Sequence, residues 1–137
     1  MADPLLRERH ILIVEDEYLL ADELRMELEE VGAIVVGPAG SVSDALALIG
    51  SDAPIDGAIL DVNLGGQLAF PVADRLVRRG VPTVFTTGYD EAAIPDRFAA
   101  VERCRKPVNI RLIMGTMRVL IDRARRGGPD LHHAIPL

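Results

Sequence analysis

The sequence predicts an α/β fold in which helices cover both faces of a five-stranded parallel sheet. Short apolar runs, which are typical of buried strands, alternate with longer stretches in which apolar residues recur at helical spacing. Strand–helix–strand repeats connect by right-handed crossovers, which makes the sheet parallel and places helices on both faces. A chain of 137 residues has the size of one such domain.

Five short segments are expected to form the strands. The first four are apolar or rich in β-branched residues, and all five end near a glycine, a proline or a polar cluster. In chain order the expected strands are His10–Val14, Ala33–Val36, the run from Ala58 to Asp61, Val81–Thr87 and a weaker Glu102–Arg105.

The segments that follow the strands are expected to form five helices. Their apolar residues recur every three or four positions, and glycines stand at several of their ends. Ser41 and Asp44 also have the spacing of a helix capping box. The expected helices are the stretch that carries Leu20, Leu24, Leu28 and Val31, the stretch from Ser41 to Ile49, Gln67–Arg79, a short segment interrupted by Pro95, and the stretch from Ile110 to Ile121.

Composition excludes several classes of protein. The net charge of −6 divides into −10 for residues 1–60 and +4 for residues 61–137, and no basic stripe is interleaved with aromatics, so nucleic acid is not an expected partner. The apolar runs are far shorter than a membrane helix, and we expect no membrane insertion and a cytoplasmic location. The single cysteine, Cys104, excludes an internal disulfide and indicates a packed thiol.

Polar residues gather where the predicted strands end. Glu15 and Asp16 follow the first strand, Asp61 ends the third, Thr87 ends the fourth and Lys106 follows the fifth. The carboxyl ends of parallel strands meet at one edge of the sheet, where the ligand sites of such folds lie. These five residues therefore form the candidate site.

Three converging carboxylates indicate a bound cation. Without one they would repel each other and resist ionisation. Mg²⁺ suits the site because it takes oxygen ligands and keeps some of its waters, with Asp16 and Asp61 as direct ligands and Glu15 acting through water. The alternative is that each acid merely caps a neighbouring helix. The presence of Thr87 and Lys106 at the other strand ends favours the site.

The remaining site residues suit an anionic ligand. Lys106 is the only lysine among 15 basic residues, and its compact ammonium makes a point contact with a phosphoryl oxygen that a guanidinium does not reproduce. Thr87 precedes Gly88, which leaves space for a phosphoryl group beside a hydroxyl donor. Thr86 competes for this role, but alternation along the strand favours Thr87.

This pattern resembles the receiver domain of two-component response regulators. The resemblance covers roughly residues 8–126, which we expect to be the domain, and leaves residues 127–137 as an expected flexible tail. It implies a flavodoxin-like, doubly wound sheet with strand order 2-1-3-4-5. It also implies that Asp61 attacks a phosphohistidine, that Thr87 and Lys106 engage the phosphoryl oxygens, and that the Lys106–Pro107 peptide is cis. The implied ligands of Mg²⁺ are Glu15, Asp16, Asp61 and the backbone carbonyl of Asn63.

Shorter motifs are similar to those of alphaproteobacterial single-domain regulators, which carry a Phe-Ala-Thr-Gly-Tyr type sequence where this chain has Phe85–Tyr89. One departure concerns the conformational switch. Many receivers have Tyr or Phe three residues before the lysine, whereas this chain has Arg103. We expect Tyr89, beyond Gly88, to act instead as the moving switch or as a shield over the acyl phosphate.

The resemblance implies a stand-alone phosphoacceptor protein rather than an enzyme. Its donor would be a sensor histidine kinase or a histidine phosphotransfer protein, and its signal would leave by contact with a downstream protein or by phosphorelay, with a homodimer through the last helices left open. One alternative is a constitutive binding module that is never phosphorylated. Another is a phosphatase of the haloacid dehalogenase type, in which the nucleophile follows the first strand and a second Asp stands two residues later, whereas Asn63 stands there in this chain.

Overall fold

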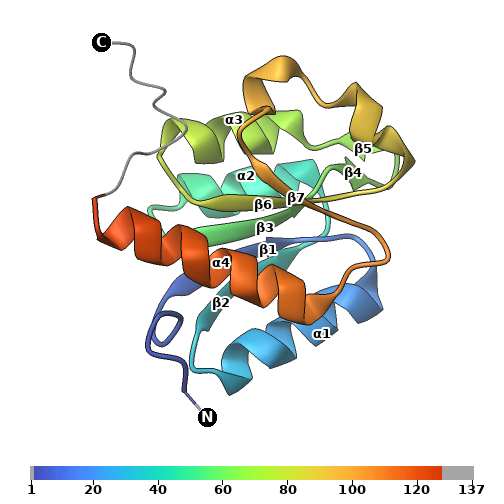
Figure 1. The fold of residues 1–137 in the computed structure, drawn as a ribbon. Helices are drawn as coiled ribbons and strands as arrows, with labels where there is room; N and C mark the ends of the chain where they lie inside the picture. Colours follow the sequence, from blue (N-terminus) through green and yellow to red (C-terminus); the bar gives the residue numbers. More distant parts are fainter. Residues whose placement is uncertain (1, 128–137) are drawn as a thin grey trace.

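The computed structural model describes residues 2–127 and contains a five-stranded parallel sheet with the order β2-β1-β3-β6-β7 (Figure 1). Its strands are β1 (His10–Val14), β2 (Ile34–Ala39), β3 (Gly57–Asp61), β6 (Thr83–Thr87) and β7 (Glu102–Arg105). Because β6 and β7 are the fourth and fifth strands of this sheet along the chain, the order agrees with the predicted 2-1-3-4-5. All four neighbouring pairs are parallel, as predicted.

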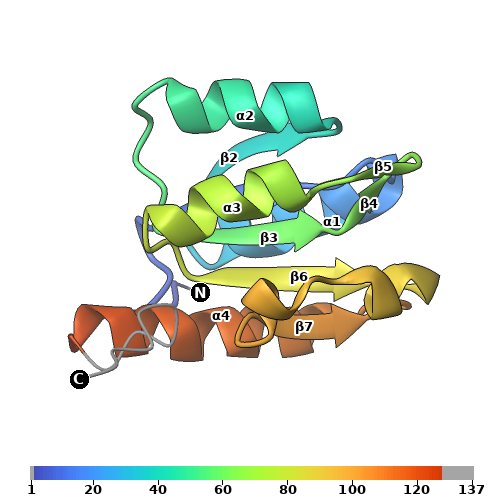
Figure 2. The same cartoon turned by 90° about the horizontal axis from the view of Figure 1, so that it is seen from above.

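Helices cover both faces of this sheet. They are α1 (Tyr18–Glu30), α2 (Val42–Gly50), α3 (Phe70–Arg78) and α4 (Ile110–Arg125). Figure 2 shows α2 and α3 on one side of the sheet and α4 on the other. One buried cluster joins the sheet to α2 and α3, and a second joins it to α1 and α4. The central strands β1, β3 and β6 are therefore buried on both faces, which explains why they lack a polar alternation.

The prediction of five helices is wrong by one. Between β6 and β7 the chain forms two 3₁₀-helices, η1 (Tyr89–Ala93) and η2 (Asp96–Phe98), in place of an α-helix. Pro95 is the N-cap of η2 with an extended backbone, and it has no N–H to continue a helix from η1. The expected interruption at Pro95 is thus confirmed, but it leaves no room for a full α-helix.

The helix predicted at Gln67–Arg79 begins later than expected. Gln67–Leu68 forms strand β5, which pairs antiparallel with β4 (Asn63–Leu64). The intervening Gly65 and Gly66 have positive φ, and the Asn63 side chain accepts a hydrogen bond of 2.7 Å from the Gly66 N–H. Pro71 lies in the first turn of α3, where a missing N–H costs nothing, so the helix begins at Phe70.

Other boundaries agree more closely with the sequence. The Ser41 hydroxyl accepts a hydrogen bond of 3.1 Å from the Asp44 N–H, which confirms the predicted helix cap. Strand β2 runs through Gly37–Pro38, where the sequence predicted its end, because an edge strand tolerates a proline. The expected tail falls outside the described residues apart from Gly127. Within residues 2–127, no helix has both the length and the hydropathy needed to cross a bilayer.

Candidate functional site

The site lies at the edge where the strands of the sheet end. In Figure 2 the arrowheads of β3, β6 and β7 lie at one end of the molecule, beside the β4–β5 hairpin and η1. Glu15 directly follows β1, Asp61 and Thr87 are the last residues of β3 and β6, and Lys106 directly follows β7. The parallel topology thus brings together residues that are up to 91 positions apart (106 minus 15).

Three carboxylates meet at this edge. Glu15, Asp16 and Asp61 each offer one oxygen, and the three oxygens lie within 4.8 Å of one another. Glu15 and Asp61 are each only 3% exposed, whereas Asp16 is exposed. A group of oxygen donors with one open side suits Mg²⁺, which binds through one or two carboxylates and retains waters.

Lys106 provides the positive charge of the cluster. Its Nζ lies 3.0 Å from an Asp61 carboxylate oxygen, 3.0 Å from a Glu17 oxygen and 3.6 Å from a Glu15 oxygen. The Lys106 N–H donates a 2.7 Å hydrogen bond to the Thr87 carbonyl, which ties the residue to the end of β6. The Lys106–Pro107 peptide is cis, as expected.

Backbone donors fix the two buried acids. The Glu17 N–H donates to a Glu15 carboxylate oxygen at 2.9 Å, and the Asn63 N–H donates to Asp61 Oδ1 at 3.1 Å. Both contacts link a strand-end acid to a backbone N–H two residues later. The carboxylates are therefore oriented by the turns that leave β1 and β3.

Burial and crowding shift the ionisation of these groups. Burial raises the pKa of Glu15 to about 8, and the charge of the Asp61 carboxylate acts in the same direction. Burial also raises the pKa of Asp61, although its hydrogen bonds with Lys106 and the Asn63 N–H oppose the rise. Burial alone would lower the pKa of Lys106, but hydrogen bonds to Asp61 and Glu17 raise it overall. Burial and the neighbouring charge therefore favour a proton on Glu15, and a further cation at this site would oppose that preference.

Two buried threonines end β6 on opposite faces of the sheet. Thr86 pairs with Asp61 across the β3–β6 ladder, and paired residues of a parallel ladder share a face. Thr87 therefore lies on the other face. Neither hydroxyl has a hydrogen-bond partner among residues 2–127. The expectation that Thr87 rather than Thr86 serves the site stays a prediction.

The exposed side of the cluster is a cleft. Its lining comes from all the elements that converge at this edge and consists of Asp16, Glu17, Asp61, Asn63, Gly65, Gly88, Tyr89 and Lys106. Tyr89 has an exposed fraction of 109%, so its ring stands out from the surface at the mouth of the cleft. Arg103 is absent from this lining, and its guanidinium donates to the Phe98 carbonyl of η2 at 3.2 Å.

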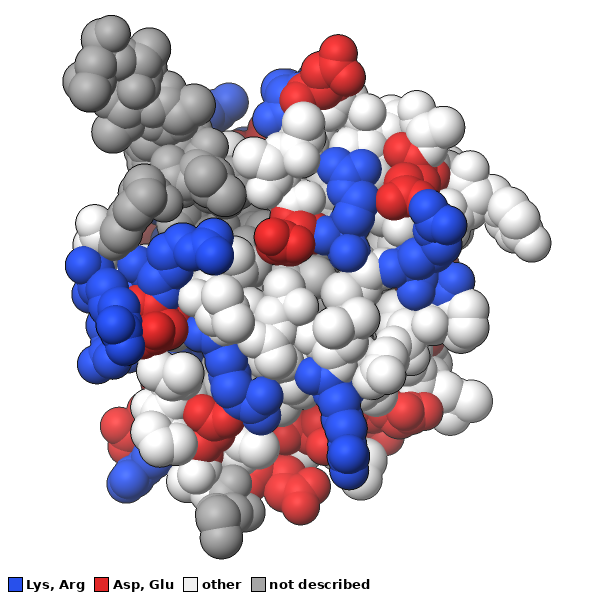
Figure 3. All heavy atoms as spheres, viewed as in Figure 1, with Lys and Arg blue, Asp and Glu red and all other residues white. Residues whose placement is uncertain are grey.

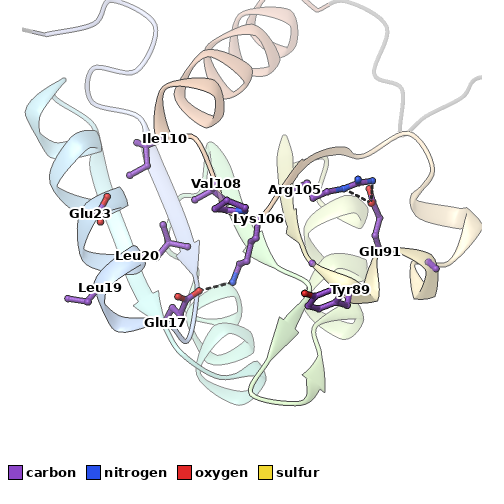
Figure 4. A pocket seen from close by; sticks show the side chains of 13 residues that line it. Glu17, Leu19, Leu20, Glu23, Tyr89, Glu91, Arg105, Lys106, Val108 and Ile110 are labelled. Carbon is purple, nitrogen blue, oxygen red and sulfur yellow. Dashed lines mark hydrogen bonds and ion pairs between the residues drawn. The ribbon is translucent and has the colours of Figure 1, made fainter.

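A longer groove continues from the cleft between α1 and the β7–α4 connection (Figure 4). Glu17, Gly88, Tyr89 and Lys106 line both hollows. The groove also has apolar lining residues, which are Leu19, Leu20, Ala92, Pro107, Val108 and Ile110. Figure 4 shows Lys106 reaching toward Glu17, and Glu91 paired with Arg105 on the far rim. The cleft is thus continuous with a surface that can hold an apolar segment.

The predicted site lacks one polar residue that the structure places there. Glu17 follows Glu15 and Asp16 in the chain, after the first strand, and the sequence pattern predicts no role for it. In the structure it is the N-cap residue of α1 and contacts the Lys106 ammonium. The signal that could have identified it is its position two residues after Glu15, at the same strand end.

Comparison with known proteins supports the predicted receiver fold. No protein-family model matches the chain, and neither does any curated protein. Among solved structures, SdrG from Sphingomonas melonis Fr1 is 39% identical with a TM-score of 0.70, and the match covers 82% of this chain and 96% of that one.

Two further structures show the same fold at lower identity. The response regulator receiver protein from Sinorhizobium medicae WSM419 is 22% identical with a TM-score of 0.72, and the match covers 85% of this chain and 97% of the other. The signal receiver domain of a LuxO-type repressor protein from Vibrio parahaemolyticus is 19% identical with a TM-score of 0.74, and the coverages are 89% and 95%.

The chain thus combines 39% identity to SdrG and the fold of a receiver protein with a cluster of three acids, in which the buried Asp61 is paired with Lys106. The chain belongs to the receiver domain family of response regulators.

Proposed function

We propose that Asp61 accepts a phosphoryl group from a phosphohistidine of a sensor histidine kinase or a histidine phosphotransfer protein. The observation that carries this proposal is the buried Asp61 carboxylate with the Lys106 ammonium 3.0 Å away, beside two further acids. A nucleophilic carboxylate needs an adjacent positive charge to accept an anionic group. The open cleft above Asp61 gives the phosphoryl group access.

In the proposed step an Asp61 oxygen attacks the phosphorus atom of the donor. The new O–P bond forms while the P–N bond to the donor imidazole breaks, and its electron pair stays on the imidazole nitrogen. Lys106, already in contact with the carboxylate, is placed to neutralise charge on a transferring oxygen. Thr87 is the proposed hydroxyl donor to the phosphoryl group, since its own hydroxyl has no partner among residues 2–127.

The residues that would hold Mg²⁺ are Glu15, Asp16, Asp61 and the backbone carbonyl of Asn63. The first three bring carboxylate oxygens within 4.8 Å of one another, and all the proposed donors are oxygens, which this cation prefers. When bound, Mg²⁺ would neutralise charge on the phosphoryl oxygens. The exposed Asp16 leaves one side of the group open to a ligand.

The groove beside the cleft is the proposed contact surface for the phosphodonor protein. Its apolar residues Leu19, Val108 and Ile110 lie next to Lys106 and Glu17, which also line the cleft. An amphipathic helix could place its apolar face here and bring a phosphohistidine to Asp61. A docking surface continuous with the reaction site would couple partner choice to phosphoryl transfer.

The surface of α4 is the proposed contact for a downstream protein target. Leu112 and Val119 are exposed on this helix at 57% and 54%. Helix α4 carries four arginines, Arg111, Arg118, Arg123 and Arg125, against one acid, Asp122. Figure 3 shows several basic side chains on this face, with acidic ones among them and below them. A homodimer that paired two α4 helices would bring like charges together. The α4 surface therefore favours an acidic partner over a second copy bound helix to helix.

Two alternatives make different predictions. A constitutive binding module would keep the surfaces described above and take up no phosphate. A phosphatase of the haloacid dehalogenase type would need its nucleophile after β1 and a second Asp two residues later, whereas Glu15 and Asp16 follow β1 and Asn63 stands two residues after Asp61. The position of Asp61 in β3 favours the receiver reaction.

Phosphoryl uptake from acetyl phosphate tests the proposal. We expect the wild type with Mg²⁺ to gain the mass of one phosphoryl group, and Asp61→Asn to gain none while it stays folded. A matched control is Asp74→Asn, which removes a carboxylate that pairs with Arg97 on the surface, away from the cleft. Uptake by Asp61→Asn would place the acceptor elsewhere, and no uptake by the wild type would favour the binding module.

A further inference from the structure

A buried hydroxyl that the proposed reaction does not use lies beside the proposed phosphoacceptor. Thr86 is 1% exposed, and its Oγ1 has no hydrogen-bond partner among residues 2–127. A buried hydroxyl without a partner destabilises a fold relative to an isosteric apolar side chain. Buried polar groups left in this state are uncommon and call for a specific explanation.

The strand register places Thr86 on the same face as Asp61. In the β3–β6 ladder, the pair Ile59–Val84 belongs to the core cluster beneath α1 and α4. The next pair, Leu60–Phe85, belongs to the cluster beneath α2 and α3. Asp61 and Thr86 form the next row, which returns to the face of α1 and α4. On its other side Thr86 pairs with Cys104 of β7.

The Asp61 carboxylate has acceptor capacity left for this hydroxyl. Its Oδ1 accepts from the Asn63 N–H at 3.1 Å, and its Oδ2 accepts from Lys106 Nζ at 3.0 Å. Each carboxylate oxygen can accept about two hydrogen bonds. Neighbouring strands lie about 4.8 Å apart, so a change between staggered χ1 rotamers can bring the Thr86 hydroxyl toward the carboxylate.

Holding this carboxylate in one orientation matters for its proposed role. The Asp61 carboxylate accepts from the backbone N–H of Asn63 and from the Lys106 ammonium, which also contacts Glu17. Lys106 is further expected to engage the incoming phosphoryl group, which would weaken its hold on the carboxylate. A further, rigid donor from β6 would keep the attacking oxygen in line through that exchange.

We propose that Thr86 is a positioning residue whose hydroxyl donates to the Asp61 carboxylate in its ionised, reactive state. This inference rests on the proposed function of Asp61. It assigns separate tasks to the two threonines, because Thr86 lies on the face of Asp61 and orients the nucleophile, while Thr87 on the other face is left as the donor to the phosphoryl group. A residue retained for this purpose should reduce stability while it increases the rate of phosphoryl uptake.

Three variants test this opposition between stability and rate. Thr86→Val keeps the shape and removes the hydroxyl, and Thr86→Ser keeps the hydroxyl. The control is Thr83→Val in the same strand, where the hydroxyl is buried but already donates to the Val81 carbonyl at 2.8 Å. Melting temperature and the rate of uptake from acetyl phosphate with Mg²⁺ are measured for each.

We expect Thr86→Val to melt about 3–6 °C higher than the wild type and to take up phosphate at least tenfold more slowly. Thr86→Ser should take up phosphate within about threefold of the wild-type rate. Thr83→Val should melt lower and react normally. A Thr86→Val protein that reacts at the wild-type rate, or a Thr86→Ser protein as slow as Thr86→Val, would overturn the inference. Absence of uptake by the wild type would instead overturn the proposed function on which it rests.

Discussion

The affinity for Mg²⁺ should increase about tenfold for each unit by which the pH rises toward 8, and it should change little above pH 8. Burial and the neighbouring Asp61 raise the pKa of Glu15 to about 8, and the Glu15 oxygen lies within 4.8 Å of the other two carboxylates. A cation placed among them must displace the proton. The apparent Kd is then multiplied by 1 + 10^(8 − pH), which is about 100 at pH 6, about 11 at pH 7 and about 1.1 at pH 9.

The same shift fixes the sign of the pH dependence of stability without metal. Between pH 4.5 and about 8 the folded state holds a proton on Glu15 that the unfolded chain has lost. The stabilising contribution is therefore complete below pH 4.5 and is lost as the pH rises through 8. The loss is at most about 1.4 kcal/mol per pH unit. Saturating Mg²⁺ should remove this decline, because the cation then takes the place of the proton.

Titration calorimetry in buffers of different ionisation enthalpy measures both the Kd and the number of protons released. We expect close to one proton to be released per Mg²⁺ bound at pH 6–7, and almost none at pH 9. The control is Glu15→Gln, which cannot release this proton and should show a much flatter dependence. A wild-type Kd that stays constant between pH 6 and pH 8, without proton release, would refute the reasoning.

Two further predictions concern the rim of the cleft. Mg²⁺ at one hundred times its Kd should stabilise the wild type by about 2.7 kcal/mol, which raises its melting temperature by roughly 10 °C, and Asp16→Ala should lose most of this gain; an equal response in both proteins would place the metal elsewhere. Tyr89→Ala should shorten the half-life of the phosphorylated state, because the outward ring at the cleft mouth obstructs the attacking water. A half-life unchanged within about twofold would exclude such shielding.

The convergence of the site could be predicted because topology alone decides it. Glu15, Asp61 and Lys106 each stand at the end of a recognisable strand, and parallel strands bring their ends to one edge. The beginning of α3 could not be predicted in the same way. The Gly65–Gly66 turn closes a short hairpin that depends on a side-chain contact of Asn63. In the sequence, however, the four-residue spacing of Val72 and Leu76 continues back to Leu68, as if the helix already included it.

Two features of the site depend on how distant strands pair, which the sequence pattern does not show. Thr86 and Thr87 are the same residue type at adjacent positions, so only the register with β3 decides which of them shares a face with Asp61. Glu17 has the sequence signature of a solvated acid at the start of a helix, and its contact with Lys106 arises because β1 and β7 end at the same edge. Both distinctions require the pairing of distant segments.

Arg103, which replaces the aromatic residue of many receivers, limits how a signal from the proposed phosphorylation could leave the site. The Arg103 guanidinium is held by the Phe98 carbonyl, and the Phe98 ring packs in the buried cluster against Phe70 and Phe85. A charged side chain fixed in this way cannot exchange between a buried and an exposed position as an aromatic ring can, because burying an unpaired guanidinium is costly. Gly88 and Tyr89 follow Thr87 directly and line both the cleft and the groove. We therefore expect the β6–η1 segment, rather than the side chain three residues before the lysine, to change conformation on phosphorylation.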